Sequence, residues 1–256
     1  MTVALAGTRL PAATHELILA PQSIKAHLAG YDVSMLGFNG GLPGPEVRMR
    51  QGQTARITLD NRLEEGALVH WHGLRVPNRM DGVNVLTQDV VIPGDSYRYQ
   101  FGVPDAGTYW YHSHSGLQEQ SGHYGPLIID PKGSDPVSYD REYVLVLSDW
   151  SFESPHTLFK KLKSSSDTFN FQKRTAGDFI DDLSDKGLSQ TLQDRKMWNQ
   201  MRMSQTDWED IGGSTYTYLI NGHSTLDNWD KWCTGPLLRK GRLNVCTRVC
   251  TRVCTR

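Results

Sequence analysis

Residues 14–131 consist of short runs in which apolar and polar side chains alternate, separated by turn-forming residues. In the run Thr54–Asn61, the apolar residues Ala55, Ile57 and Leu59 fall at every second position. Successive side chains of a strand point to opposite faces of a sheet, so such a run predicts a strand with one buried face. Similar runs occupy His15–Ala20, Glu46–Arg50, Leu68–Leu74, Ser96–Val103, Thr108–His114 and Tyr124–Asp130. Short strands with turn signals about every 8–12 residues predict an all-β sandwich or barrel.

The pattern changes after the turn-rich stretch Pro131–Pro136, which we interpret as a domain boundary. Beyond it, two apolar runs predict buried strands, and the long polar segment between them contains few turn residues and looks partly helical. The sequence therefore predicts a first β domain at residues 14–131 and a second, incomplete one at 137–229, with an insertion at about 154–213. The strands are expected at Arg141–Leu147 and Tyr216–Ile220, and the helices at Leu158–Lys163 and Leu188–Met203.

The two ends of the chain depart from this pattern. Residues 1–13 are small and apolar, and Ala4-Leu5-Ala6 resembles a signal-peptidase site, although a charged n-region is missing. Taken alone, this segment fits either the remainder of an export leader or the start of a cytoplasmic chain. Residues 230–256 lose the alternation, and Val245–Arg256 repeats Val-Cys-Thr-Arg three times. We expect a frameshift or assembly error there, which would cut the second domain short.

A rival interpretation makes the repeat a cysteine-rich metal tail. Cys246, Cys250 and Cys254 are spaced four residues apart and would share one face of a helix. Val, Thr and Cys are poor helix formers, so this alternative is weaker. The first 232 residues contain no cysteine, which excludes a disulfide-stapled fold for the main body.

Composition excludes two broad classes of function. The 27 Lys and Arg residues and 28 Asp and Glu residues give a net charge of -1, so there is no basic field for nucleic acid. No run of eighteen apolar residues is present, so no transmembrane helix is expected.

Two His-x-His motifs are the strongest chemical signal. His70 and His72 flank a tryptophan, His112 and His114 flank a serine, and each pair is expected to share one face of a strand. A single pair is often a surface feature, but two pairs in one β domain predict a shared metal site, because buried imidazoles need partners. Neutral imidazole suits copper, zinc, iron and nickel, with copper(II) leading in affinity. A zinc hydrolase would carry His-x-His-x-Asp-His, whereas Gly73-Leu74 follows the second histidine here.

The residues around these motifs are assigned simpler roles. The aromatic neighbours are expected to pack on the opposite face of each strand from the histidines. The isolated histidines are interpreted as surface or structural residues, and the methionines as helix packing rather than copper(I) ligands. These groups are Trp71, Trp110 and Tyr111; His15, His27, His123, His156 and His223; and Met197, Met201 and Met203.

With these motifs in view, the sequence resembles the multicopper oxidase family, and within it the bacterial copper-resistance protein A type. The two copper signatures are His70-Trp71-His72-Gly73 and Trp110-Tyr111-His112-Ser113-His114, in the family's order and separation. The resemblance covers roughly residues 14–229. Further matching stretches include Met80-Asp81-Gly82, Gly107–Trp110, Tyr124–Ile129, Leu147–Trp150, Asp194–Trp198 and Thr215–Gly222.

The resemblance implies cupredoxin-like Greek-key β-sandwich domains and a trinuclear copper cluster of one type 2 and two type 3 ions. His70 would then bind the type 2 copper, and His72, His112 and His114 the type 3 pair. Asp81 would assist proton delivery as the catalytic carboxylate; its other interpretation is a turn residue before Gly82. The family's remaining cluster histidines and its type 1 copper site lie in His-x-x-His-x-His and His-Cys-His motifs, and neither motif occurs in these 256 residues.

The leading hypothesis is therefore a periplasmic copper-resistance oxidase that couples oxidation of a small reductant, cuprous ion or a phenol, to reduction of O2 to water. This chain would supply only the first-domain half of the cluster and be inactive alone. A second hypothesis is a non-catalytic periplasmic protein that sequesters copper ions. A third is a structural cupredoxin-like module with a vacant site.

Overall fold

The computed structural model describes residues 14–135, 139, 141–164, 176–201, 216–224, 226–227 and 250–255. At 141, 198–201 and 250–255 it describes the backbone only. Our predictions for residues 1–13, Met203, Cys233 and Cys246 lie outside this range.

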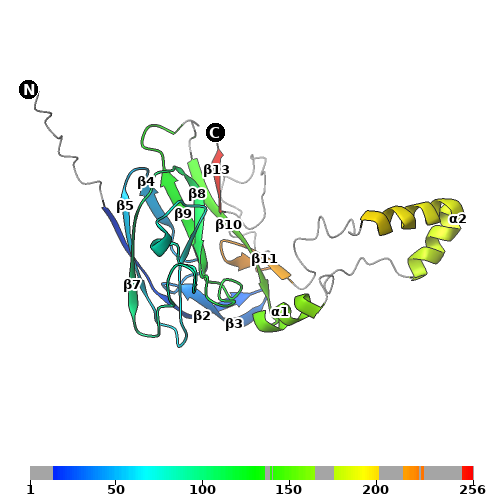
Figure 1. Cartoon of the computed structure of the whole chain (residues 1–256), viewed down its shortest axis with the longest axis horizontal. Helices are drawn as coiled ribbons and strands as arrows, with labels where there is room; N and C mark the ends of the chain where they lie inside the picture. The colour runs from blue at the N-terminus through cyan, green and yellow to red at the C-terminus, as the bar shows by residue number, and fades with distance from the viewer. Residues whose placement is uncertain are drawn as a thin grey trace, which may run out of the picture. The chain divides into compact units, whose positions relative to one another are not determined.

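Two sheets form a β-sandwich around one apolar core (Figure 1). The first sheet has the order β1-β5-β7 and the second the order β4-β9-β8-β6. Both contribute buried side chains to the same core, as the all-β prediction requires. The strands are β1 (Thr14–Leu19), β4 (Val47–Arg50), β5 (Thr54–Asp60), β6 (His70–His72), β7 (Ser96–Gly102), β8 (Gly107–His112) and β9 (Tyr124–Asp130).

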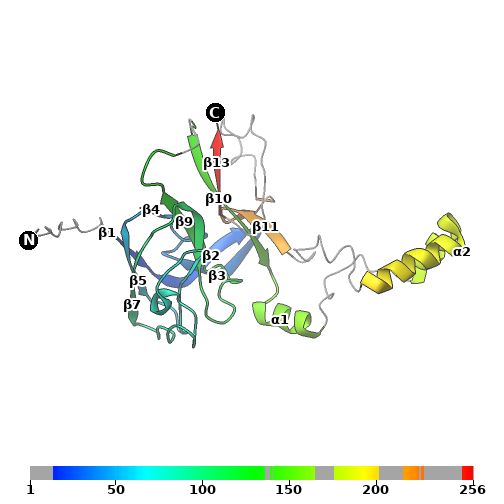
Figure 2. The same ribbon diagram turned by 45° about the horizontal axis from the view of Figure 1, so that its top comes forward.

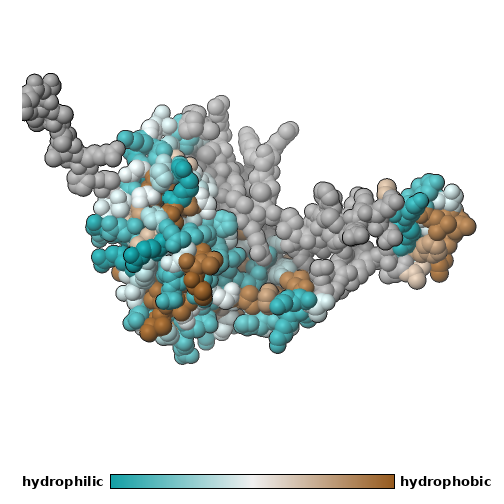
Figure 3. All heavy atoms as spheres, viewed as in Figure 1, coloured by the Kyte–Doolittle hydropathy of each residue, from teal (hydrophilic) through white to brown (hydrophobic). Residues whose placement is uncertain are grey.

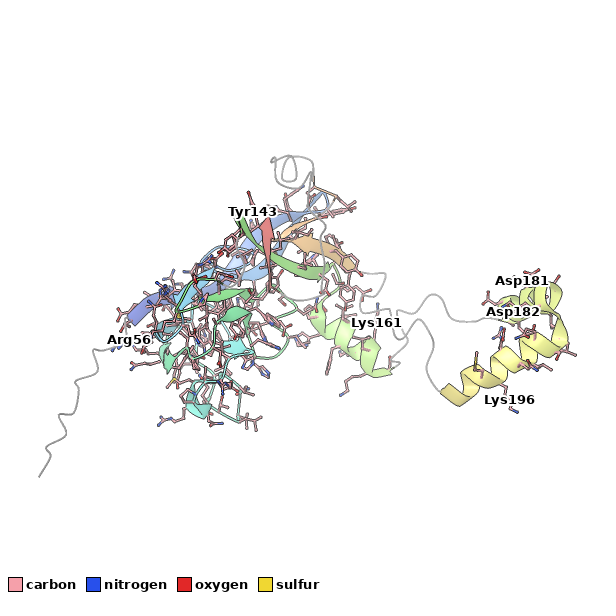
Figure 4. All side chains as sticks on the ribbon, turned by 90° about the horizontal axis from the view of Figure 1, so that it is seen from above. Arg56, Tyr143, Lys161, Asp181, Asp182 and Lys196 are labelled. Atoms are coloured by element: carbon pink, nitrogen blue, oxygen red, sulfur yellow. The ribbon has the colours of Figure 1, made fainter. Side chains whose placement is uncertain are left out.

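The alternation along β5 explains which face of its sheet is buried. Ala55, Ile57 and Leu59 are almost inaccessible to solvent, whereas Arg56 points outward and pairs with Glu16 of β1 at 3.2 Å (Figure 4). Each buried aliphatic side chain of this size stabilises the fold by about 1.5–3 kcal/mol relative to full exposure.

A hairpin that the sequence analysis did not predict consists of β2 (Pro21–Leu28) and β3 (Tyr31–Phe38), which lie side by side in Figures 1 and 2. Its two-residue turn has Ala29 and Gly30 both at positive φ, the geometry of a type I′ turn. Alanine is unfavourable there, but the Asp227 carboxylate accepts hydrogen bonds from both turn amides, at 2.6 and 2.9 Å. A residue about 200 positions away thus stabilises the turn, and no local pattern could reveal it.

The remaining sheet has the order β12-β11-β10-β13. β10 (Arg141–Ser151) and β11 (Tyr216–Ile220) confirm the two strands predicted after residue 136; β12 (His223–Ser224) is short. The turn residue Asn221 accepts a hydrogen bond from the Val146 amide at 2.7 Å. β13 (Cys250–Thr255) pairs with β10 in antiparallel register, so the helical interpretation of the terminal repeat is wrong for this segment.

Two helices occupy the predicted insertion. α1 (Pro155–Ser164) includes the segment expected to be helical, and the Ser154 side chain caps its first turn at the Thr157 amide. α2 (Ala176–Met201) begins earlier than predicted and is interrupted at Gly187, whose backbone is non-helical. The sequence analysis missed its first half because Gly187 and the surrounding polar residues conceal the helical spacing.

The chain divides into two compact units, residues 1–150 with 218–256 and residues 151–217. In the second unit, charged side chains form pairs on or next to the helices, among them Lys161 with Glu153 at 2.6 Å and Lys186 with Asp182 at 2.8 Å. Lys161 and Asp182 are labelled in Figure 4. Exposed apolar side chains on α2 gather in Figure 3 as brown spheres; they are Ile180, Leu188, Leu192 and Met197. No helix among the described residues combines the length and hydropathy needed to cross a membrane.

Candidate metal centre

The pairing of β6 with β8 brings the two His-x-His motifs together. In the antiparallel register His70 lies opposite His112, and His72 lies opposite Trp110. Residues directly opposite each other in such a pair point to the same face of the sheet. The side chains of His70, His72, Trp110 and His112 therefore project from one face of the sheet. Trp71 points from the opposite face into the core.

Three of the four imidazoles form a compact group. Nitrogen atoms of His70, His72 and His112 all lie within 4.8 Å of one another. His114 lies two residues beyond the end of β8, not within the strand as predicted. Its ring centroid is nevertheless 5.6 Å from that of His70 and 6.1 Å from that of His112.

Hydrogen bonds on one ring nitrogen leave the other available. His70 Nδ1 lies 2.7 Å from the backbone oxygen of Asp81, and His112 Nδ1 lies 2.9 Å from that of Ser113. A carbonyl oxygen can only accept, so Nδ1 carries the proton in both rings and Nε2 has the free lone pair. This arrangement, in which the outer nitrogen donates and the inner one is free, is typical of metal-binding histidines.

The donor atoms of His72 and His112 face each other. His72 Nδ1 lies 3.2 Å from His112 Nε2. Imidazole nitrogens bind first-row metals such as zinc at about 2.0–2.1 Å, so two nitrogens on one ion at a near-right angle lie roughly 3 Å apart. The observed separation fits either a single N–H···N hydrogen bond or two ligands of the same ion.

The local electrostatics favours neutral imidazole. Partial burial lowers the pKa of His72, and the neighbouring His112 and His70 lower it further, while Glu119 opposes the shift. The neutral form is the one that binds metal ions, so His72 is available as a ligand at neutral pH.

Trp110 does not pack on the face opposite the histidines, and our prediction for this residue is wrong. Its ring stacks on His112, with centroids 4.1 Å apart and planes at 21°, and on His72, at 4.8 Å and 27°. The reason is the strand period itself: Trp110 and His112 are two residues apart and share a face.

The prediction is confirmed for the other two aromatic residues. Trp71 and Tyr111 are fully buried in the core, where Trp71 meets Tyr99 edge to face at 5.2 Å. The Tyr111 hydroxyl donates a hydrogen bond to the Pro45 oxygen at 2.8 Å. These side chains hold β6 and β8 in place from the core side of the sheet.

Asp81 is both a turn residue and a neighbour of the histidines. It follows the 3-10 turn η1 (Asn78–Met80), and its carboxylate oxygen lies 3.4 Å from His70 Nδ1, with the side chain 32% exposed. The next residue, Gly82, has a φ of 71°, and a Cβ there would overlap the Val69 carbonyl. This close approach holds the Asp81 turn against the strand that carries His70.

The turn after His114 contributes residues that the sequence analysis missed. Ser113 donates a hydrogen bond to Gln118 at 2.7 Å, and Gln118 in turn donates to the Gly66 oxygen at 3.0 Å. The Glu119 carboxylate reaches His112 Nδ1 at 3.1 Å. The run of polar residues directly after the second motif was the available signal, but it does not reveal which of them turn inward.

Two of the isolated histidines have clearly different surroundings. His27 is exposed and paired with Asp32 at 2.8 Å, whereas His123 is fully buried, with its ring tilted at 31° against that of Phe38. A surface role for His27 and a structural role for His123 follow directly. Met197 is exposed on α2, in the unit that does not hold the histidine cluster.

Comparison with known proteins identifies relatives of the whole β region. Residues 22–134 match the family model described as multicopper oxidase. The chain is 51% identical over 203 residues to copper resistance protein A of Escherichia coli, covering 79% of this chain and 34% of that protein. It is 47% identical to copper resistance protein A of Pseudomonas syringae pv. tomato, covering 84% of this chain and 35% of that protein. The chain thus spans about a third of the length of these curated relatives.

Solved structures give the same assignment. A laccase mutant from B. aclada is 35% identical, with a TM-score of 0.55, over 61% of this chain and 29% of its own. The blue copper oxidase from Nitrosomonas europaea is 26% identical, with a TM-score of 0.54, over 82% of this chain and 54% of its own. Sequence, sandwich fold and converging imidazoles agree that this chain belongs to the multicopper oxidase family.

Proposed function

We propose that this chain is part of a copper-resistance oxidase that couples one-electron oxidation of a small reductant, cuprous ion or a phenol, to four-electron reduction of O2 to water. The observation that carries the proposal is the convergence of imidazoles on one sheet face, with the Nε2 atoms of His70 and His112 not used as proton donors. Copper resistance protein A is the name of several relatives about half identical to this chain.

The donor set fits copper. All the clustered donors are imidazoles, which suit copper, whereas calcium and magnesium prefer oxygen ligands. In the proposed assignment His70 binds the type 2 ion, and His72, His112 and His114 bind the type 3 pair. When bound, the copper ions supply the route by which electrons reach dioxygen.

The chain's own residues orient ligands and handle protons. His72 Nδ1 can donate to His112 Nε2 in the metal-free protein; moving that proton to the exposed Nε2 of His72 frees both facing nitrogens as ligands. Asp81 touches His70 and is partly open to solvent, so its carboxylate can take up a proton from water and hold it beside the cluster. Reduction of O2 to water consumes four protons, and this is the proposed role of Asp81.

We propose that these 256 residues supply only half of the ligands of the copper cluster. We propose that residues 14–131 are a first cupredoxin-like domain, that β10–β12 begin a second at 137–229, and that the protein acts in the periplasm. The type 1 copper site is proposed to belong to a part of the protein outside these 256 residues, which contain no His-Cys-His. A second candidate function is copper sequestration without catalysis, for which the imidazole cluster alone would suffice.

Copper stoichiometry tests the site. The purified chain is expected to bind copper, and a His70→Ala/His112→Ala double variant is expected to lose it. His156→Ala is the matched control, because His156 is exposed on α1 in the other compact unit. Copper binding that survives the double variant contradicts the histidine assignment.

Oxygen uptake in the presence of hydroquinone distinguishes the two functions. The chain alone is expected to show none, since it lacks the type 1 motif. An otherwise identical protein extended to the length of its relatives is expected to consume oxygen if the oxidase proposal is right, and to bind copper without uptake if the protein only sequesters it.

A further inference from the structure

Among the clustered histidines, His112 has the most enclosed ring. The residue is 5% exposed, and the Trp110 ring covers one face at a centroid distance of 4.1 Å. Its Nδ1 has two acceptors, the Ser113 backbone oxygen at 2.9 Å and the Glu119 carboxylate at 3.1 Å. The second acceptor is not part of either His-x-His motif.

A closed turn, residues 115–122, holds Glu119 in this position. The Gln118 amide donates to the Ser115 oxygen at 3.2 Å, and the Gly122 amide donates to the Glu119 oxygen at 3.1 Å. Gln120 anchors the same turn to β10 through Asp149, at 3.1 Å. The hydrogen-bonded backbone of this turn therefore positions the Glu119 carboxylate, whose side chain is 36% exposed.

The surroundings of His70 repeat this arrangement. There too a peptide oxygen and a carboxylate oxygen both lie near Nδ1, at 2.7 and 3.4 Å, but both belong to Asp81. At His112 the two acceptors come from different residues, Ser113 and Glu119. The two rings that face each other across the strand pair thus have the same pair of acceptor types on their outer nitrogens.

We infer that Glu119 is a positioning residue for His112: its carboxylate shares the Nδ1 proton with the Ser113 oxygen and so keeps the Nε2 lone pair directed into the cluster. A carboxylate accepts more strongly than a neutral carbonyl, and it makes the opposite ring nitrogen a better ligand. This inference rests on the proposed copper-binding function, but the hydrogen bond that it describes belongs to the metal-free protein.

The test is the tautomer of His112 in the metal-free chain of 256 residues, measured by nitrogen-15 NMR of labelled histidine rings, with His112→Gln used to assign the signal. The wild type is expected to carry the proton on Nδ1. Glu119→Gln retains an acceptor and is expected to keep this tautomer. Glu119→Leu is expected to show a clear population protonated on Nε2. Glu64→Leu, at an exposed site, is the matched control and is expected to behave as the wild type.

Copper(II) affinity, measured by competition with a chelator, provides the second readout. Loss of an outer partner of a metal-binding histidine typically costs about 10–100-fold in affinity, which is expected for Glu119→Leu, with a smaller loss for Glu119→Gln. A wild-type tautomer in Glu119→Leu overturns the inference, whatever its affinity. If the wild type binds no copper, the proposed function fails, and the metal-free tautomer still decides the role of Glu119.

Discussion

At the scale of single residues, a partner at the outer nitrogen or an aromatic ring on one face orients the imidazoles of His70, His72 and His112. His70 donates to the Asp81 oxygen, His112 to the Ser113 oxygen, and the indole of Trp110 covers His72 and His112. These contacts fix ring rotation before any metal binds, which lowers the cost of ordering the ligands. Trp110 thus belongs to the site, although our prediction from the sequence is that it packs on the opposite face of the strand.

His123 differs from the histidines of the cluster, because it is buried in the core and its ring nitrogens are not held by hydrogen bonds among the described residues. The residue is fully buried, and neither ring nitrogen has a hydrogen-bond partner within the described part of the chain. Burial lowers its pKa to about 4, and the nearby Gly37 backbone, outside hydrogen-bonding geometry, opposes this weakly. The folded protein therefore keeps this ring neutral at a pH where the unfolded chain protonates it.

This difference predicts acid sensitivity of the fold. Below a pH of about 6.5 the His123 ring is protonated in the unfolded chain, whereas in the folded chain it is protonated only below a pH of about 4. The free energy of unfolding therefore decreases as the pH falls from about 6.5 to about 4. Relative to a His123→Leu variant, the wild type is expected to lose about 2 kcal/mol of unfolding free energy between pH 7 and pH 5. Urea unfolding at both pH values measures the difference.

The control is His156→Leu, at an exposed position on α1. This variant is expected to follow the wild-type pH dependence. Equal pH dependence in wild type and His123→Leu would contradict the assignment, because it would mean that the buried ring does not govern the acid response.

At the scale of elements, the cluster depends on how one loop approaches one strand. The Asp81 turn lies against β6 because Gly82 lacks a side chain and leaves room for the Val69 carbonyl. Gly52, in another turn, has a similar positive φ of 89° but open space around its Cα. A comparison of substitutions at Gly82 and Gly52 therefore separates the cost of the backbone conformation from the cost of contact with the Val69 carbonyl.

Gly82→Ala is therefore expected to cost more than Gly52→Ala. Both changes carry a positive-φ penalty of about 1 kcal/mol, and only the first adds a steric clash that pushes the turn away from His70. Thermal or urea unfolding gives the stability, and copper(II) titration gives the effect on the site. Equal losses of stability in the two variants, with equal copper affinity, would show that the close approach has no role.

At the scale of the whole molecule, the cluster and the helical insertion belong to different compact units. Every residue named around the four imidazoles, from Gly66 to His123, lies in the first unit, and α1 and α2 lie in the second. Residues in separate compact units are expected to act independently. The insertion should therefore be dispensable for the proposed copper site.

Replacement of residues 153–214 by a short Gly-Ser linker tests this independence. The copper(II) affinity of the shortened chain is expected to stay within about twofold of the wild type, as for sites that do not couple. The measurement is the same chelator competition used for the point variants. A much weaker affinity, in a protein whose sandwich remains folded by circular dichroism, would show that the insertion supports the site.

The sequence by itself determined the fold class, the strands that carry the motifs and the four candidate ligands. Strand alternation and metal ligation are local properties, readable from neighbours two residues apart, as in Ala55-Ile57-Leu59 and His70-Trp71-His72. The proposal that the metal is copper depends on family resemblance, since imidazole pairs alone suit several ions.

The tertiary structure decided what depends on contacts between distant segments. Asp227 stabilises the turn at Ala29, the register of β6 against β8 places His70 opposite His112, and Glu119 reaches His112 through a folded turn. Each of these contacts joins residues whose separation along the chain bears no relation to their separation in space. Their positions follow from strand register and loop closure, which no local pattern of apolar and polar residues encodes.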